Sequence, residues 1–143
     1  MPQPRIDPHI QLSDQRRLAY AEYGEPAGVP IFLFHGLPGS RLAWGYLPGN
    51  SFPSGLRVIA PDRPGYGRSD PNPGRTLLDW ANDIAELADA LAIAKFEIAG
   101  VSGGGPGALA CTWEMPDRLI SVGVVSCATP TDGKIPQKYS HEL

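Results

Sequence analysis

Ser102 is the residue whose type and surroundings point most directly to chemistry. It lies in the run GVSGG, 100–104, which fits the pattern G-x-S-x-G. An apolar run, 96–99, precedes it and good helix formers, 108–110, follow it, so the serine falls where a strand turns into a helix. Glycines on both sides relieve the crowding of such a strained turn because they lack a Cβ. The pattern predicts an exposed hydroxyl beside the positive end of a helix, the position of a nucleophile.

Two other interpretations of the same stretch compete with a nucleophile. The first is a plain glycine-rich turn, since a bare G-x-S-x-G often occurs by chance. The second is a dinucleotide-binding fingerprint, because Gly103, Gly105 and Ala108 also fit G-x-G-x-x-G/A. That fingerprint needs a carboxylate at the end of the next strand, and the predicted strand 119–128 ends without one. The nucleophile is therefore the favoured interpretation.

Two further loops follow predicted buried strands. The strand 31–34 leads into HGLPGS, 35–40, and the strand 56–60 leads into the loop 61–70, which contains DRPGYGRSD. With the run 100–104, these loops are expected at the carboxyl ends of consecutive parallel strands. Sheets of this kind place their ligands at that edge.

The elements that position these loops alternate between strand and helix. They predict an α/β fold with a mostly parallel sheet, helices on both faces and an N-terminal antiparallel hairpin from 10–14 and 16–23. An amphipathic helix is expected after Thr76, which begins a weak capping box with Asp79. Its acidic residues are expected to form a solvated face and nothing more: Asp79, Asp83, Glu86 and Asp89.

The length of 143 residues suits one domain. We expect a loose N-terminal arm, 1–9, which contains three prolines, then a domain spanning 10–128 and a polar tail, 129–143. The first ten residues have no apolar core typical of a signal peptide, and no apolar run reaches membrane-spanning length. These features predict a soluble, cytoplasmic protein.

Charge and cysteine usage narrow the classes of partner. The net charge of -3 offers no basic patch, which argues against nucleic acid and against an anionic membrane as partners. Cys111 and Cys127 lack metal-ligand spacing and are expected to be packed thiols.

The three loops HGLPGS, DRPGYGRSD and GVSGG, in this order and spacing, resemble the α/β-hydrolase superfamily over roughly 10–128. The resemblance implies that Ser102 is the nucleophile and that the backbone N–H groups of Leu37 and Gly103 form the oxyanion hole. It also implies that His35 holds its loop and is not the catalytic base. A serine at this turn argues against haloalkane dehalogenase and epoxide hydrolase chemistry, which use Asp there. No metal or organic cofactor is implied.

The sequence departs from the family pattern after the predicted sixth strand. The family order is Ser, then Asp or Glu, then His in a loop after the last strand. The chain therefore looks like the N-terminal half of a hydrolase, an incomplete fold that lacks the last strands and the histidine loop. Asp132 and His141 follow Ser102 in the right order and are candidate stand-ins, but no predicted element fixes them.

We therefore expect a serine hydrolase acting on a small-molecule ester or related acyl substrate, nearly inactive as this truncated chain. The alternative is a non-catalytic remnant or ligand-binding module that keeps the pocket loops. The last predicted strand contains the uncharged, β-branched run 122–125. An edge of this composition predicts self-association.

Overall fold

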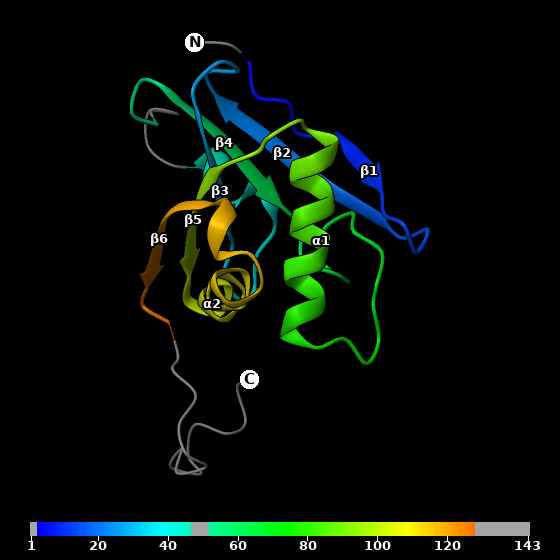
Figure 1. Cartoon of the computed structure of the whole chain (residues 1–143). Coiled ribbons are helices and arrows are strands. Elements are labelled where there is room, and N and C mark those ends of the chain that lie inside the picture. The colour runs from blue at the N-terminus through cyan, green and yellow to red at the C-terminus, as the bar shows by residue number, and fades with distance from the viewer. Residues whose placement is uncertain (1–2, 47–51, 128–143) are drawn as a thin grey trace.

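The computed structural model describes residues 3–46 and 52–127, which contain a six-stranded mixed sheet in the order β1-β2-β4-β3-β5-β6 (Figure 1). The strands are β1 (His9–Gln11), β2 (Arg17–Gly24), β3 (Val29–Phe34), β4 (Leu56–Pro61), β5 (Phe96–Val101) and β6 (Leu119–Val125). The α-helices are α1 (Leu77–Ala90) and α2 (Gly105–Glu114), and the 3-10 helices are η1 (Arg41–Tyr46), η3 (Ser102–Gly104) and η4 (Pro116–Arg118).

The strand pairing confirms the predicted fold class. β1 pairs with β2 as the expected antiparallel hairpin, and β2 pairs antiparallel with β4. β3 pairs parallel with both β4 and β5, and β5 pairs parallel with β6. Because β4, β3 and β5 are neighbours running in one direction, the three glycine-containing loops that follow them leave the sheet at the same edge.

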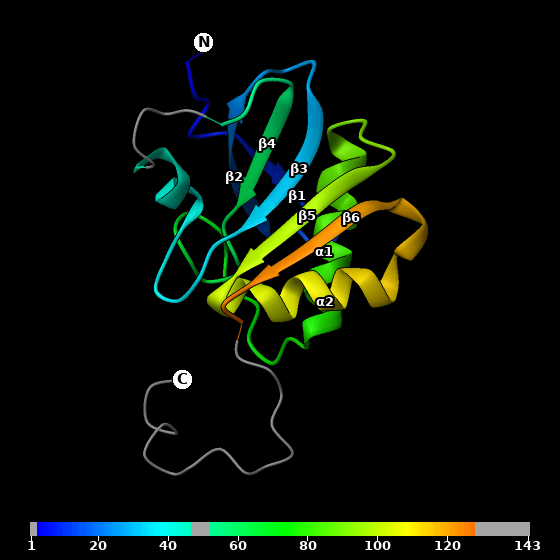
Figure 2. The ribbon, with the colours of Figure 1, turned by 90° about the vertical axis from the view of Figure 1, so that its left-hand side faces the viewer.

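Helices cover both faces of the sheet, but unequally. Both α-helices pack on one face, and η1 lies on the other (Figure 2). The strand β3 supplies both layers: Phe32 and Phe34 belong to the core beneath the α-helices, whereas Leu33 packs on the opposite side with a cluster that includes Trp44. A strand buried on both faces must be apolar throughout, which explains the unbroken run in the sequence.

The helix α1 begins at the predicted cap. The Thr76 hydroxyl accepts a hydrogen bond from the Asp79 N–H, and the Asp79 carboxylate accepts one from the Thr76 N–H. The apolar side chains Trp80, Ile84 and Leu87 are buried as the spacing predicts. The capping box is thus confirmed, and so is burial at these three positions, whereas Leu77, which the same spacing assigns to the apolar face, is 57% exposed because it lies at the first turn of the helix.

The acidic face of α1 is only in part the solvated surface that the sequence predicts: Asp89 is 69% exposed, but two other carboxylates are bound to the hairpin. The Asp83 side chain is only 5% exposed and accepts two hydrogen bonds from Arg16, at 2.6 and 3.0 Å. Glu86 accepts two more, from the N–H and hydroxyl of Ser13, at 2.7 Å each. These carboxylates attach the tip of the hairpin to the helix. Helical periodicity could not reveal this, because the partners lie 67 and 73 residues away in the chain.

The described part of the N-terminal arm is not loose. Arg5 exchanges two backbone hydrogen bonds with Glu22, at 3.0 and 2.8 Å, and the Ile6 carbonyl accepts one from Arg41 Nε. The expectation of a loose arm is therefore wrong for residues 3–8. The predicted polar tail, 129–143, lies outside the described residues.

No helix within 3–46 and 52–127 combines the length and apolar character needed to span a membrane.

Candidate active site

Ser102 lies at the turn from β5 through η3 into α2. Its φ of 51° is in the left-handed region that side chains rarely adopt, and its side chain is exposed. Its carbonyl accepts a hydrogen bond from the Gly105 N–H, which closes the turn. A Cβ placed on Gly100 would lie 2.6 Å from the Gly104 oxygen, so the turn needs glycine there. The predicted strained placement is confirmed, and the role as nucleophile stays a prediction.

The loop after β3 lies directly against this turn. A Cβ built on Gly36 would lie 3.2 Å from the Ser102 Cβ and 3.7 Å from its Oγ. A Cβ built on Gly103 would lie 2.8 Å from Leu37 Cγ. The structure therefore brings Ser102, Leu37 and Gly103 together, as the resemblance implies.

His35 is a neutral structural link between two loops. It is 1% exposed, and its Nδ1 lies 2.9 Å from the Gly36 carbonyl oxygen. A carbonyl can only accept, so Nδ1 carries the proton and Nε2 is free to accept from the Arg63 N–H at 3.3 Å. Burial lowers the pKa of His35 below its ordinary value of 6.5. Because both ring nitrogens are occupied, His35 suits loop positioning rather than general-base catalysis.

Arg63, the second residue after β4, is a site residue that the sequence did not single out. Its Nη1 donates to the Gly103 carbonyl at 2.9 Å and its Nη2 to the Gly36 carbonyl at 3.1 Å. Its guanidinium carbon lies 4.9 Å from the centre of the Tyr66 ring. Burial lowers the pKa of the Arg63 guanidinium. Its position in a loop at the carboxyl end of a strand was the available signal, but its two partners become evident only in the fold.

Asp62 shapes the loop after β4. It is fully buried, and Arg41 Nη1 donates to its carboxylate at 2.8 Å. The backbone N–H of Arg68 donates to the same carboxylate at 2.9 Å. Gly67, with a φ of 53°, passes so close that a Cβ would collide with this carboxylate. All these partners hold the loop, which supports a structural role for Asp62.

Residues 29–139 match the family described as alpha/beta hydrolase fold. The chain belongs to this family. It is 33% identical over 123 residues to a non-heme chloroperoxidase of Streptomyces lividans, covering 85% of this chain and 45% of that protein. It is 32% identical to a haloalkane dehalogenase of Psychrobacter cryohalolentis, with 92% and 46% covered. It is 31% identical to a proline iminopeptidase of Neisseria gonorrhoeae, with 87% and 42% covered. The chain thus spans less than half the length of these relatives.

Solved hydrolase structures have the same arrangement. Est816, described as an N-acyl homoserine lactone degrading enzyme, superposes with a TM-score of 0.74 at 32% identity, over 85% of this chain and 46% of that one. A thermophilic esterase from Thermogutta terrifontis superposes with a TM-score of 0.73 at 29% identity, over 92% and 48%. The described sheet and helices of this chain therefore have the alpha/beta hydrolase fold of these solved structures.

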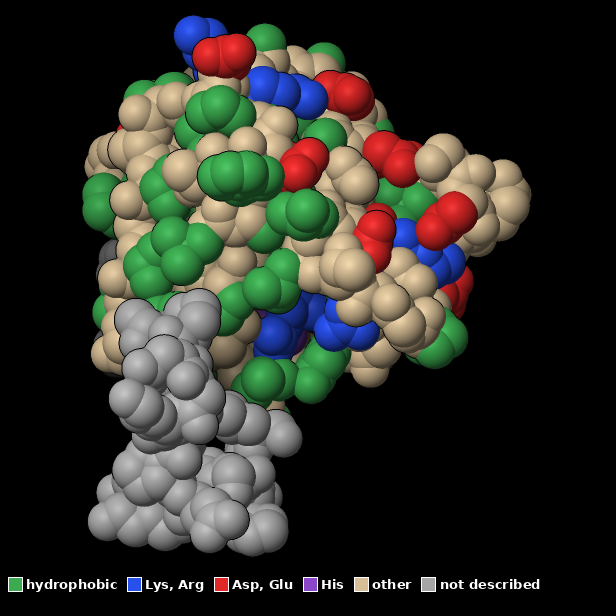
Figure 3. Space-filling model, turned by 60° about the horizontal axis from the view of Figure 1, so that its bottom comes forward, with side chains coloured by type: hydrophobic (Ala, Val, Ile, Leu, Met, Phe, Trp, Pro, Cys, Tyr) green, Lys and Arg blue, Asp and Glu red, His purple; other side chains and the backbone are tan. Residues whose placement is uncertain are grey.

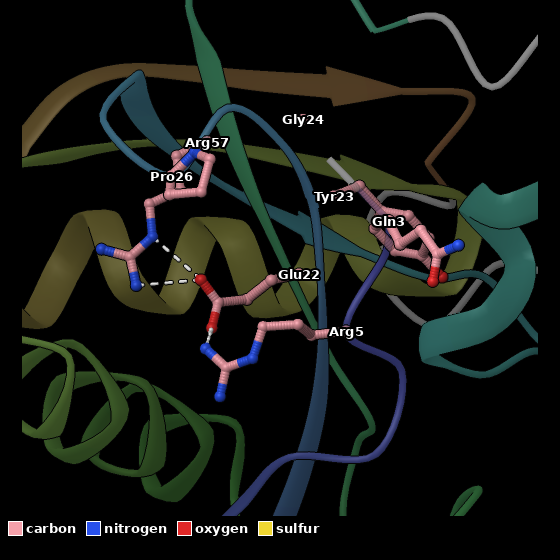
Figure 4. Close-up of a pocket in the computed structure, with 7 residues that line it drawn as sticks. All are labelled: Gln3, Arg5, Glu22, Tyr23, Gly24, Pro26 and Arg57. Atoms are coloured by element: carbon pink, nitrogen blue, oxygen red, sulfur yellow. Dashed lines mark hydrogen bonds and ion pairs between the residues drawn. The ribbon is translucent and has the colours of Figure 1, made fainter. Parts of the chain in front are cut away.

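Basic side chains gather in a hollow between hydrophobic ones on the face of the molecule shown in Figure 3. A separate hollow, shown in Figure 4, lies beside β2 and β4. There the Glu22 carboxylate pairs with both Arg5 and Arg57, at 2.8 and 2.9 Å, so it offsets one of the two positive charges. Ser102 is not among the residues that line it.

The candidates for the remaining catalytic groups, Asp132 and His141, lie outside the described residues. Within 3–46 and 52–127, no cluster of three or more His, Cys, Asp or Glu side chains is arranged to hold a metal ion.

Proposed function

We propose that this chain carries the nucleophile and oxyanion hole of a serine hydrolase acting on a small-molecule ester or related acyl substrate. The observation that carries the proposal is the left-handed backbone of exposed Ser102, with Gly36 packed against its side chain. The hydroxyl would attack the carbonyl carbon as a base takes its proton. The N–H groups of Leu37 and Gly103 would stabilise the negative oxygen, each by about 3 kcal/mol.

The names of the relatives support acyl chemistry. They include an esterase, an N-acyl homoserine lactone degrading enzyme and a proline iminopeptidase. Attack on a carbonyl carbon suits an ester, a lactone and a peptide alike. The chain also resembles a haloalkane dehalogenase, but Ser102 occupies the position at which we expect such enzymes to carry Asp. The serine favours acyl transfer over dehalogenation.

A general base is the group that the described residues do not provide. Their histidines are His9, which lies in β1, and His35, whose two nitrogens are already bonded. We propose that the 143-residue chain alone is therefore nearly inactive, because loss of the histidine of a serine triad costs about a millionfold in rate. The base would come from His141 or from further polypeptide. The second candidate function is a ligand-binding module without turnover.

Labelling with a fluorophosphonate separates these two functions. The reagent forms a covalent bond with an activated serine, and added imidazole can stand in for a missing histidine base. We expect mass spectrometry to find the label on Ser102, slowly without imidazole and faster with it. Ser102→Ala is the control and should stay unlabelled. If Ser102 is labelled no faster than other serines even with imidazole, the non-catalytic module is the better account. If labelling is already fast without imidazole, the chain supplies its own base, and His141→Ala should then slow it.

A further inference from the structure

Arg63 joins the two loops that carry the proposed oxyanion donors. One nitrogen donates to the carbonyl of Gly103 in the turn after β5, and another donates to the carbonyl of Gly36 in the loop after β3. A guanidinium is planar and holds its N–H groups in a fixed fork. One side chain therefore sets the spacing and orientation of these two carbonyls.

The Gly36 carbonyl belongs to the same peptide unit as the Leu37 N–H. That peptide is trans, since the cis bond of this loop is the next one, Leu37–Pro38. In a trans peptide the N–H points opposite to the C=O. Two side chains hold the carbonyl, Arg63 through Nη2 at 3.1 Å and His35 through Nδ1 at 2.9 Å. The direction of the Leu37 N–H is therefore set by the donors at the far end of its own peptide.

The second oxyanion donor is anchored in the same way. The Gly103 N–H shares a peptide unit with the Ser102 carbonyl, which accepts the Gly105 N–H. As one of the first N–H groups of a helical segment, the Gly103 N–H has no acceptor in a preceding turn. The Gly103 carbonyl belongs to the following peptide unit, so the bond from Arg63 holds the other side of the same residue and links Gly103 to the Gly36–Leu37 unit.

The charge of Arg63 strengthens this arrangement. Its Nε is buried without a hydrogen-bond partner, and no carboxylate within the described ranges forms an ion pair with it. A half-buried cation without a counter-ion disfavours folding, so its presence needs a compensating reason. A hydrogen bond from a cation to an amide carbonyl polarises the amide and makes its N–H a stronger donor. The same charge adds positive potential where a negative oxygen would form.

We propose that Arg63 is a positioning residue, which orients and polarises the Gly36–Leu37 peptide and fixes it relative to Gly103 for oxyanion binding. This inference rests on the proposed function of Ser102. Arg63 acts through the backbone rather than by touching the substrate.

The first arm of the test is nuclear magnetic resonance of the 143-residue chain, which needs no activity. In Arg63→Gln, the carbonyl carbon of Gly36 and the amide nitrogen and proton of Leu37 should shift more than signals elsewhere. Arg75→Gln is the matched control, because Arg75 is exposed and its charge lies near enough to lower the pKa of Arg63. In that variant these signals should stay in place. If they stay in place in Arg63→Gln as well, the proposal is overturned.

The second arm is the rate of fluorophosphonate labelling of Ser102 with imidazole present. Removing an oxyanion donor itself costs about a hundredfold to a thousandfold, so Arg63→Gln should slow labelling by about tenfold or more. Arg63→Lys keeps the charge, but its single ammonium group cannot span both carbonyls. Its labelling rate should therefore lie between those of the unchanged protein and Arg63→Gln. Arg75→Gln should stay within about twofold of the unchanged protein.

The two arms separate failure of this inference from failure of the proposed function. If both Arg63 variants are labelled at Ser102 as fast as the unchanged protein, Arg63 is not a positioning residue. The same conclusion follows if Arg75→Gln slows labelling as much as Arg63→Gln does. If Ser102 is not labelled in any variant, the proposed function fails, and the shifts at Gly36 and Leu37 still decide whether Arg63 orients that peptide. Cooperative thermal unfolding shows that each variant is folded. If Arg63→Gln does not fold, the comparison is made with Arg63→Lys, which is the milder change.

Discussion

At the scale of single residues, the site combines a strained serine with fully bonded neighbours. Ser102 has a left-handed backbone, whereas His35 and Asp62 use their polar atoms to hold loops. Backbone strain at a residue whose side chain is exposed suggests a role other than stability. This division of roles leads to two predictions.

Replacing Ser102 by glycine should stabilise the protein relative to replacement by alanine. A left-handed backbone costs an L-residue roughly 1–2 kcal/mol, and alanine keeps that cost whereas glycine removes it. The greater freedom of glycine in the unfolded chain offsets about 0.5–1 kcal/mol, so Ser102→Gly should unfold at a free energy about 0.5–1 kcal/mol above that of Ser102→Ala. Urea denaturation of both variants measures the difference. Equal stability would mean that the strain at Ser102 is no larger than this offset and would contradict the prediction.

His35 should make stability depend on pH in the mildly acidic range. Burial lowers its pKa in the folded state below the ordinary value of 6.5. As pH falls below 6.5, the unfolded chain therefore binds a proton at His35 that the folded chain does not, and the free energy of unfolding decreases. In His35→Gln this decrease between pH 6.5 and about 5 should become smaller. In His9→Gln, which changes an exposed histidine of β1, it should persist. A slope that is unchanged in His35→Gln would contradict the assignment.

At the scale of elements, the acidic side of α1 holds the tip of the β1–β2 hairpin. Arg16, just before β2, bonds Asp83, and Ser13 bonds Glu86. Arg16 also bonds Asp14, at 2.6 Å. The hydrogen bond to Asp83 is the main cause of the raised pKa of Arg16.

Asp83→Asn should lower the free energy of unfolding by about 2 kcal/mol. The value lies below the roughly 3–5 kcal/mol of a fully buried pair because Arg16 is 15% exposed and keeps Asp14 as a partner. Asp89→Asn is the matched control on the same helix, since Asp89 is 69% exposed and pairs with Arg118. It should cost less than about 1 kcal/mol. Chemical denaturation of both variants measures these costs, and equal costs would mean that the Asp83–Arg16 pair contributes no more than an exposed ion pair.

At the scale of the whole molecule, apolar side chains are exposed near the last described strand. On β6, Ile120 and Val125 are 55% and 53% exposed, and on α2 Trp113 is 78% exposed. Within the described residues, β6 pairs with β5 alone. Its run 122–125 has no charge and no proline, the features that normally protect an edge.

We propose that the 143-residue chain associates with a second copy of itself through β6. The unpaired backbone groups of the edge would pair, which buries the exposed β-branched side chains. Val125→Lys should shift the chain toward the monomer on a sizing column, because a lysine at the edge disfavours pairing. Trp113→Lys changes an exposed residue of α2 and should leave the association in place. A clean monomer of the unchanged chain would contradict the proposal. Loss of association in Trp113→Lys alone would place the contact on α2 instead.

The sequence by itself determined the local structure. Glycines around Ser102, apolar runs such as 31–34 and the capping box at Thr76 act over a few residues, so their consequences follow from neighbours in the chain. The common edge of the three loops also followed, because parallel strands leave their loops at one end.

The tertiary structure alone decided which distant polar groups meet. Asp83 is buried rather than solvated because Arg16 reaches it from another element, and Arg5 fixes an arm that looked loose. In the sequence, Arg63 looks like an ordinary turn residue. Only the fold brings its loop after β4 beside the loops after β3 and β5, where it lies between Gly36 and Gly103. Hydrogen bonds and charge act through space over a few ångströms, so spacing along the chain cannot predict them until the fold has set the distances.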